Sequence, residues 1–230
     1  MLAIVPARSG SKGVPGKNVR LLAGRTLLDY TAEAARQSGV VDRMVLSTDA
    51  EDVAEAGRLA GLEVPFMRPP ELARDDTPML PVLQHAIEML SGAGWVPEFV
   101  VLLQPTSPLR RPEHVRRALT LLTDSGADSV VTVVEVPKHF SPDYVMRIEN
   151  GALRPFLPEG AGVTRRQDVR PAYSRDGTVY AFRRDTVSRY NSIYGPDCRP
   201  LIIDADESLS IDTPRDWSDA ERILAERDLR

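Results

Sequence analysis

The chain contains 230 residues, a length that suits one large domain with a sizeable buried core. Its net charge of -4 argues against a nucleic-acid-binding protein, which normally presents a basic face. No apolar run approaches the roughly 18 residues that a membrane-spanning helix needs, and the N-terminus lacks the basic flank, long apolar stretch and cleavage site of a secretion signal. The one cysteine, Cys198, can form no internal disulfide. We therefore expect a cytoplasmic protein that binds neither nucleic acid nor membranes.

The first 135 residues alternate between apolar runs typical of buried strands and segments with helical periodicity. The predicted strands are 3–6, 43–47, 63–66, 99–103 and 129–134, and the predicted helices are 26–37, 51–60, 79–90 and 112–123. This alternation predicts an α/β fold with a doubly wound, mostly parallel sheet covered by helices on both faces. In such sheets ligands bind beyond the carboxyl ends of the strands. Functional residues are therefore expected in the loops that follow strands.

Residues 138–172 interrupt this pattern. The segment is rich in proline, glycine and charged residues, and Asn150-Gly151 predicts a small hairpin within it. We interpret the segment as an arm inserted into a single domain that spans residues 1–230. Beyond the arm, strands are predicted at 177–183 and 200–203, and a closing helix at 214–227.

The loop at 8–18, which follows the first predicted strand, combines glycines with cations. Its glycines allow backbone N–H groups to turn toward a phosphate, while Arg8, Lys12 and Lys17 offset charge on the phosphate oxygens. The chain has only three lysines among its 29 basic residues, and two of them lie in this loop, where a compact ammonium suits such a ligand. The spacing matches neither GxxxxGK[ST] nor GxGxxG. The loop predicts a polyphosphate site of another kind, and a flexible turn is the alternative.

This loop and four other segments resemble the signature motifs of one enzyme family. They are IVPARSGSKGVPGKN at 4–18, RPPELARDD at 68–76, LLQPTSPLR at 102–110, RRQDVRPAYSRDGTVY at 165–180 and SLSIDTPRDW at 208–217. Together they resemble the CMP-sialic acid synthetases, also called acylneuraminate cytidylyltransferases, and less closely the 3-deoxy-manno-octulosonate cytidylyltransferases. The resemblance implies a Rossmann-like nucleotidyltransferase fold and a homodimer in which the arm reaches the partner subunit.

The resemblance also implies which residues bind the nucleotide. The residues that match positions against CTP are Arg8, Ser11, Lys12, Gly13, Lys17, Asn18, Arg68, Asp75 and Thr77. Of these, Arg8, Lys12 and Lys17 are expected to take part in catalysis by neutralising phosphate charge.

A second group of matching residues is implied to bind the acceptor. It consists of Gln104, Thr106, Ser107, Arg166, Arg175 and Tyr180. Other interpretations stay open for some of the motif residues. Gln104 could cap its own loop, Tyr180 could be a core ring on a strand, and Arg110 and Arg111 could simply start a solvated helix.

Nucleotidyl transfer needs a divalent cation, and carboxylates are the side chains that Mg²⁺ prefers. Asp212 matches the acidic residue of the last motif, so we expect it to be the Mg²⁺ ligand and a catalytic residue. Asp216 is predicted to lie in the first turn of the following helix. The family usually carries a second aspartate where this chain has Ser210. Either Asp204 or Asp206 replaces it, or Asp212 acts with water and phosphate as the other ligands.

Further departures from the family pattern lie on the acceptor side. Ser174 stands where sialic acid enzymes have an arginine, Asp176-Gly177-Thr178 replaces Asn-Gly-Ala, and Met79 replaces a serine. The expected reaction is transfer of CMP from CTP to an acidic acceptor, with release of pyrophosphate. The expected acceptor is a sialic-acid-like nonulosonic acid.

Three alternatives stay open. The first is a cytidylyltransferase that acts on a small phosphonate or another acid. The second is a nucleotide-binding protein without catalytic activity, which the missing second aspartate suggests. The third is a glycosyltransferase that uses a preformed sugar nucleotide, although Asp204-Ala205-Asp206 lies too near the C-terminus for the DxD metal motif of such enzymes.

Overall fold

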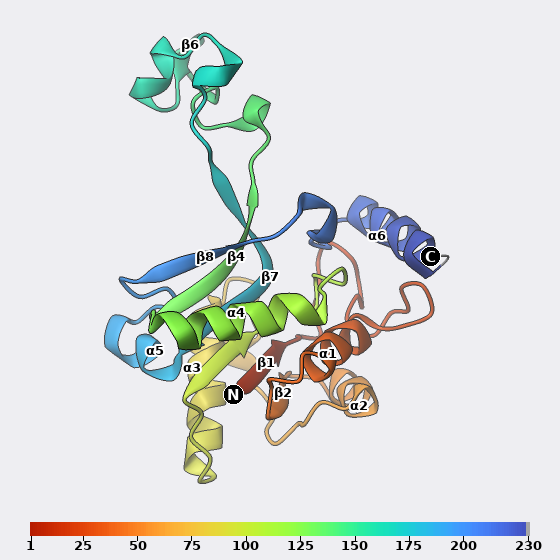
Figure 1. Cartoon of the computed structure of the whole chain (residues 1–230). Helices are drawn as coiled ribbons and strands as arrows, with labels where there is room; N and C mark the ends of the chain where they lie inside the picture. The colour runs from red at the N-terminus through yellow and green to blue at the C-terminus, as the bar shows by residue number, and fades with distance from the viewer. Residues whose placement is uncertain (229–230) are drawn as a thin grey trace.

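The computed structural model describes residues 1–228 and shows, within them, a six-stranded central sheet in the order β2-β1-β3-β7-β4-β8 (Figure 1). The strands are β1 (Leu2–Pro6), β2 (Arg43–Ser47), β3 (Phe99–Leu102), β4 (Ser129–Glu135), β7 (Tyr173–Arg183) and β8 (Cys198–Ile202). Strand β1 runs parallel to β2 and β3, and β4 runs parallel to β8. Strand β7 is antiparallel to both of its neighbours, β3 and β4. The predicted mostly parallel sheet is confirmed.

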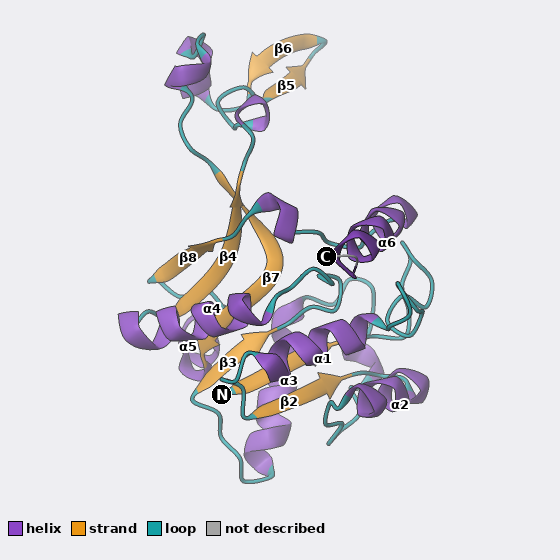
Figure 2. Ribbon diagram, turned by 45° about the vertical axis from the view of Figure 1, so that its right-hand side comes forward, coloured by secondary structure: helices purple, strands orange, loops and turns teal. Residues whose placement is uncertain are grey.

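Helices cover both faces of this sheet. One face packs against α1 (Leu27–Gln37), α2 (Glu51–Ala60) and α4 (Pro112–Ser125), and the other against α3 (Met79–Gly92) and α5 (Arg184–Tyr190). Figure 2 shows α1 and α4 in front of the sheet and α3 behind it. Successive side chains of a strand point to opposite faces, so Ala3 and Val5 pack with the first group of helices and Leu2 and Ile4 with the second. The fold is therefore doubly wound, as predicted.

A third apolar cluster joins the two ends of the chain. Helix α6 (Pro214–Asp228) packs Trp217 and Leu224 against Val14 of the glycine loop, and buried Ile211 lies in the same cluster. This packing places the segment that precedes α6 beside the loop that follows β1. Residues about 200 positions apart in the sequence thus come together at one edge of the sheet.

Three features of the fold differ from the sequence-based prediction. The prediction of a strand at 63–66 is wrong, because the structure shows only an isolated bridge between Val45 and Glu63 there. Pro65 has no N–H to donate to a ladder, which explains the short pairing. Helix α5 was not predicted, and β7 begins four residues earlier than expected.

The arm, residues 138–172, leaves the sheet between β4 and β7 and stands away from the body of the molecule (Figure 1). It contains β5 (Met146–Glu149) and β6 (Ala152–Pro155), which pair as an antiparallel hairpin. Asn150 and Gly151 at its turn have φ of 51° and 77°, so the predicted hairpin is confirmed. Three short 3₁₀ helices complete the arm: Lys138–Phe140, Pro158–Gly162 and Arg166–Asp168.

Two other 3₁₀ helices lie outside the arm, at Pro70–Leu72 and Ala205–Glu207. None of the helices described in residues 1–228 is long and apolar enough to cross a lipid bilayer.

Candidate active site

A cavity of about 280 Å³ opens at the carboxyl ends of β1 and β3. The chain passes from β1 to β2 on one side of the sheet and returns to β3 on the other, so this is the point where the strand order reverses. Ligands of doubly wound proteins bind at such a point. The cavity is lined by Pro6, Arg8, Gly10, Ser11, Lys17, Asn18, Arg68, Met79, Gln104, Pro105, Thr106, Ser210 and Asp212. The structure thus brings eight of the predicted site residues to one cavity.

The glycine loop forms one wall of this cavity. The Asn18 Nδ2 donates to the Arg8 backbone oxygen at 3.0 Å, which closes the loop on itself. Gly13 lies against the segment of Asp212, because a Cβ atom at Gly13 would stand 1.8 Å from the Asp212 backbone oxygen. No side chain fits in that space. The glycine therefore allows the two ends of the chain to meet here.

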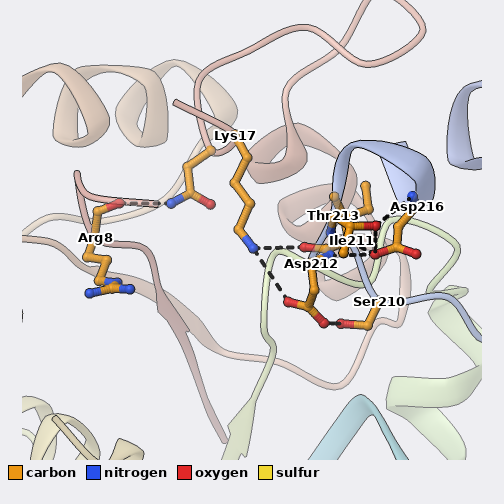
Figure 3. Close-up of polar contacts among 8 residues, drawn as sticks. Arg8, Lys17, Ser210, Ile211, Asp212, Thr213 and Asp216 are labelled. Atoms are coloured by element: carbon orange, nitrogen blue, oxygen red, sulfur yellow. Dashed lines mark hydrogen bonds and ion pairs between the residues drawn. The ribbon is translucent and has the colours of Figure 1, made fainter. Parts of the chain in front are cut away.

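Lys17 links the glycine loop to the segment before α6, as Figure 3 shows. Its Nζ donates to the Ile211 backbone oxygen at 2.8 Å and lies 3.8 Å from Asp212 Oδ1. The side chain is only 15% exposed. Burial lowers the pKa of Lys17, and the Asp212 carboxylate partly opposes that shift. Lys17 thus sets the position of Asp212 and also lines the cavity with positive charge.

The other two predicted cations share one carboxylate. Arg8 and Lys12 both form ion pairs with Asp75, and these contacts lower the pKa of the Asp75 carboxyl. Lys12 is 81% exposed and, like Asp75, lies outside the cavity lining. The Thr77 hydroxyl donates to the Glu71 backbone oxygen at 3.2 Å within the same loop. The motif at 68–76 is therefore next to the glycine loop, as nucleotide binding by both would require.

Arg68 lies beneath the cavity and is buried. Its Nε donates to Ser47 Oγ at 3.0 Å, and its Nη2 donates to the Ser47 backbone oxygen. Desolvation lowers its pKa to about 10. The guanidinium remains charged at neutral pH and adds to the positive potential of the site.

The acceptor residues predicted in the loop after β3 lie on the opposite side of the cavity. Gln104 and Thr106 line it, and Ser107 is buried with a hydroxyl that has no hydrogen-bond partner among the described residues. Gly177 of β7 is their neighbour, because a Cβ atom there would lie 3.5 Å from Gln104 Oε1 and 3.8 Å from Ser107 Oγ. An unpartnered buried hydroxyl is unfavourable, and Ser107 is not among the residues that line the cavity.

Three predicted acceptor residues lie farther along the chain. Tyr180 is half-buried, and burial raises its pKa. Its ring meets that of Tyr194 edge to face with centroids 6.5 Å apart, and the Arg175 guanidinium lies 5.2 Å from the Tyr194 ring centroid. Arg166 lies in the arm and is exposed. The structure thus joins Tyr180 and Arg175 through Tyr194, and none of these three predicted acceptor residues is among those that line the cavity.

Sequence reasoning missed the place of Tyr194 and misjudged Arg110. Tyr194 follows α5, an element without a clear sequence signal. Arg110 does not start a solvated helix: it is buried, whereas the neighbouring Arg111 is exposed and pairs with Glu207 at 2.7 Å.

Asp212 is the carboxylate that lines the cavity. Its side chain is 69% exposed, and Ser210 Oγ donates to its Oδ2 at 3.0 Å. Asp216 accepts from the backbone N–H of Asp212 at 3.0 Å and of Thr213 at 2.7 Å, so it caps the start of α6 as predicted. Figure 3 shows the dashed contact from Ser210 to the Asp212 carboxylate, with Lys17 approaching from the other side.

The residues present fit Mg²⁺ bound through one carboxylate. Among residues 1–228 no group of three or more His, Cys, Asp or Glu side chains is arranged to hold a metal ion. Asp204 and Asp206 line a different cavity, of about 810 Å³, together with Arg111, Arg222 and Arg227. Mg²⁺ commonly binds through one or two carboxylates and keeps water and substrate phosphates as its other ligands. The structure favours Asp212 with water and phosphate over the other two aspartates.

Comparison with known proteins agrees with this geometry. A family model described as cytidylyltransferase matches residues 2–224. The chain is 34% identical over 230 residues to a CMP-N,N'-diacetyllegionaminic acid synthase of Legionella pneumophila, which covers 97% of this chain and 96% of that protein. It is 34% identical over 218 residues to an N-acylneuraminate cytidylyltransferase of Streptococcus agalactiae, covering 94% of this chain but 51% of that longer protein.

A solved structure shares the fold. It is that of a CMP:2-keto-3-deoxy-manno-octonic acid synthetase complexed with CTP, with a TM-score of 0.74, 20% identity and 98% of each chain covered. The predicted resemblance to the CMP-sialic acid synthetases and the prediction of a CTP-dependent nucleotidyltransferase are confirmed, and the chain belongs to the cytidylyltransferase family.

Proposed function

We propose that the protein transfers CMP from CTP to a sialic-acid-like nonulosonic acid and releases pyrophosphate. One observation carries the proposal: a single cavity joins the cationic glycine loop, the Asp212 carboxylate and the loop of Gln104. The relative that matches this chain over nearly its full length is named for N,N'-diacetyllegionaminic acid. That acid is therefore the first acceptor to test.

In this proposal the two substrates meet between the two walls of the cavity. The N–H groups of the glycine loop, with Arg8 and Lys17, hold the triphosphate, and Gln104 and Thr106 face the acceptor. The anomeric hydroxyl of the acid attacks the α-phosphorus and loses its proton to water as the new P–O bond forms, while the bond to pyrophosphate breaks and pyrophosphate leaves. Mg²⁺ held by Asp212 would supply neutralisation of the phosphate charge. Positioning and charge stabilisation account for the rate, without a covalent enzyme intermediate.

Pyrophosphate release in the presence of CTP and Mg²⁺ tests the proposal. The panel contains N,N'-diacetyllegionaminate, N-acetylneuraminate, 3-deoxy-manno-octulosonate and small phosphonates. We expect turnover with at least one nonulosonic acid, and mass spectrometry should identify its CMP conjugate. Turnover with phosphonates alone would overturn the acceptor while keeping cytidylyl transfer. Binding of CTP without pyrophosphate release from any acid would favour a nucleotide-binding protein.

We also propose that the protein is a homodimer in which the arm contacts the partner subunit. In support, the arm exposes large apolar side chains, among them Ile148 at 77%, Leu153 and Phe156. Such a group on a projecting hairpin is typical of an interaction surface. Arg166, which lies in the arm, would then approach the acceptor side of the partner's site.

Replacing both Ile148 and Leu153 with Asp should therefore convert a dimer into a monomer of 25.4 kDa, because two charges would be buried at the interface. Light scattering coupled to size exclusion measures the change. Since the side chains are exposed, the melting temperature of the monomer body should change little. A wild-type protein that is already monomeric would contradict the dimer.

A further inference from the structure

Arg110 is a buried cation whose contacts join three parts of the fold. In the described part of the chain its guanidinium donates to the Thr178 backbone oxygen (Nε, 2.7 Å), the Gln104 backbone oxygen (Nη2, 2.5 Å) and Thr31 Oγ1 (Nη1, 3.3 Å). None of these acceptors is a carboxylate. Desolvation lowers its pKa to about 9. Burial of a cation without a hydrogen-bonded counterion is unfavourable, so its hydrogen bonds to neutral oxygens must be well formed.

Two of these oxygens belong to residues that face each other across the sheet. The antiparallel register of β3 and β7 pairs Leu102 with Tyr180, and two residues farther on it would pair Gln104 with Thr178. The ladder with β7 stops at Leu102. The Leu103 N–H points to the other edge of β3 and donates to the Ile4 oxygen, which continues the parallel pairing with β1. One guanidinium therefore stands where direct backbone pairing of Gln104 and Thr178 would be.

A side chain also replaces backbone pairing on the other edge of β7. The Val179 N–H donates to Thr132 Oγ1 at 2.8 Å, and the Thr132 hydroxyl donates to the Val179 oxygen at 3.1 Å. The β4–β7 register shifts between Val131 and Val133. At Thr178 and Val179, two consecutive residues of β7, a side chain thus stands between β7 and each of its two neighbouring strands. Gly177, the residue before Thr178, lies against Gln104 Oε1 and Ser107 Oγ.

We propose that Arg110 is a positioning residue for the acceptor side of the site. It fixes the loop of Gln104, which lines the cavity, at a set separation from β7 and so keeps the acceptor wall of the cavity in place. The inference rests on the proposed function, and it adds a residue that touches neither substrate. Lysine cannot replace it, because one ammonium cannot reproduce a planar fork that spans two carbonyls.

Kinetics of Arg110→Lys test this role. We expect kcat/KM for the nonulosonic acid to fall by on the order of 10²-fold, since small misplacements of a binding group have effects of that size. The Kd of CTP, measured by calorimetry, should stay near the wild-type value, because the hydrogen bonds of Arg110 within residues 1–228 go to Thr31, Gln104 and Thr178 and not to the glycine loop. The matched control is Arg117→Lys, which changes an exposed arginine of α4 and should alter neither quantity.

Backbone exchange and chemical rescue distinguish positioning from general stability. In Arg110→Lys and Arg110→Ala, amide hydrogen exchange should accelerate at 104–109 and 176–180 but not in β1 or α3. Methylguanidinium should restore part of the acceptor turnover of Arg110→Ala by filling the vacated site. If Arg110→Ala does not fold, Arg110→Lys decides.

Several outcomes would overturn the inference: unchanged kinetics in Arg110→Lys, equal losses for CTP and acceptor, or exchange that accelerates throughout the sheet. Failure of the wild type to use any nonulosonic acid would instead refute the proposed function. In that case the exchange pattern and CTP affinity still test whether Arg110 holds the two segments in place.

Discussion

Lys17→Ala is expected to lower turnover by on the order of 10²- to 10³-fold, the usual effect of removing one preorganised charge that faces a developing anion. The expected loss has two causes. The Lys17 ammonium lines the cavity, and it also holds the segment of Asp212 through the Ile211 backbone oxygen at 2.8 Å. Steady-state pyrophosphate release measures the loss. The melting temperature should stay close to that of the wild type, because the apolar clusters remain intact.

Lys12→Ala provides the comparison for Lys17. Its ammonium is 81% exposed and pairs with Asp75 at the rim, so its removal should have a distinctly smaller effect on kcat. Equal effects of the two substitutions would show that burial and the contact with Ile211 give Lys17 no special role. Near-normal activity of Lys17→Ala would remove this residue from the mechanism.

The second large effect is expected for Asp212→Asn. An amide keeps the shape of the carboxylate but removes its charge, so turnover at a fixed Mg²⁺ concentration should fall by at least about 10²-fold, because several kcal/mol of charge stabilisation depend on the metal. The half-maximal Mg²⁺ concentration should rise at the same time. A Mg²⁺ titration of the initial rate measures both. Asp219→Asn, an exposed change on α6, is the matched control.

The reciprocal variant is Ser210→Asp. Ser210 Oγ lies 3.0 Å from Asp212 Oδ2, so an aspartate there would put a second carboxylate beside the first and should lower the half-maximal Mg²⁺ concentration. An unaltered Mg²⁺ requirement in both variants would place the metal elsewhere.

Local patterns predicted the elements of the fold and the glycine loop, because the residues that determine them are contiguous. The strand after Met1, the turn glycines and the cations of residues 8–18 lie within one short stretch, and the structure places Arg8 and Lys17 of that stretch in the cavity lining but not Lys12. Helix α5 carried too few apolar residues for a helical pattern, and the first residues of β7 are exposed and polar at the base of the arm. Their structure depends on tertiary pairing that periodicity does not encode.

The acceptor side was harder to predict, because its arrangement depends on contacts between distant segments. Arg110 precedes a helix and is followed by another arginine, which favours a solvated position, yet α1, β7 and the Gln104 loop enclose it. Its burial follows from where β3 stops pairing with β7. Tyr194 reaches Tyr180 from a loop that no motif marks. A sequence motif indicates which residues form the site, whereas the neighbours that position those residues depend on how distant segments pack together.

The contact of the glycine loop with the segment before α6 has a consequence for biosynthesis. Lys17 and Ile211, which are hydrogen-bonded, are 194 positions apart in the sequence, and Gly13 contacts Asp212 across a similar separation. The ribosome synthesises the N-terminal segment first, so a nascent chain exposes an incomplete nucleotide site until residues 211 and 212 emerge from the exit tunnel. Chains stalled before that point should not retain CTP as the released protein does. Assembly of the site is thus among the last events of synthesis, and a chain terminated before residue 212 lacks Asp212, the carboxylate that we propose for Mg²⁺.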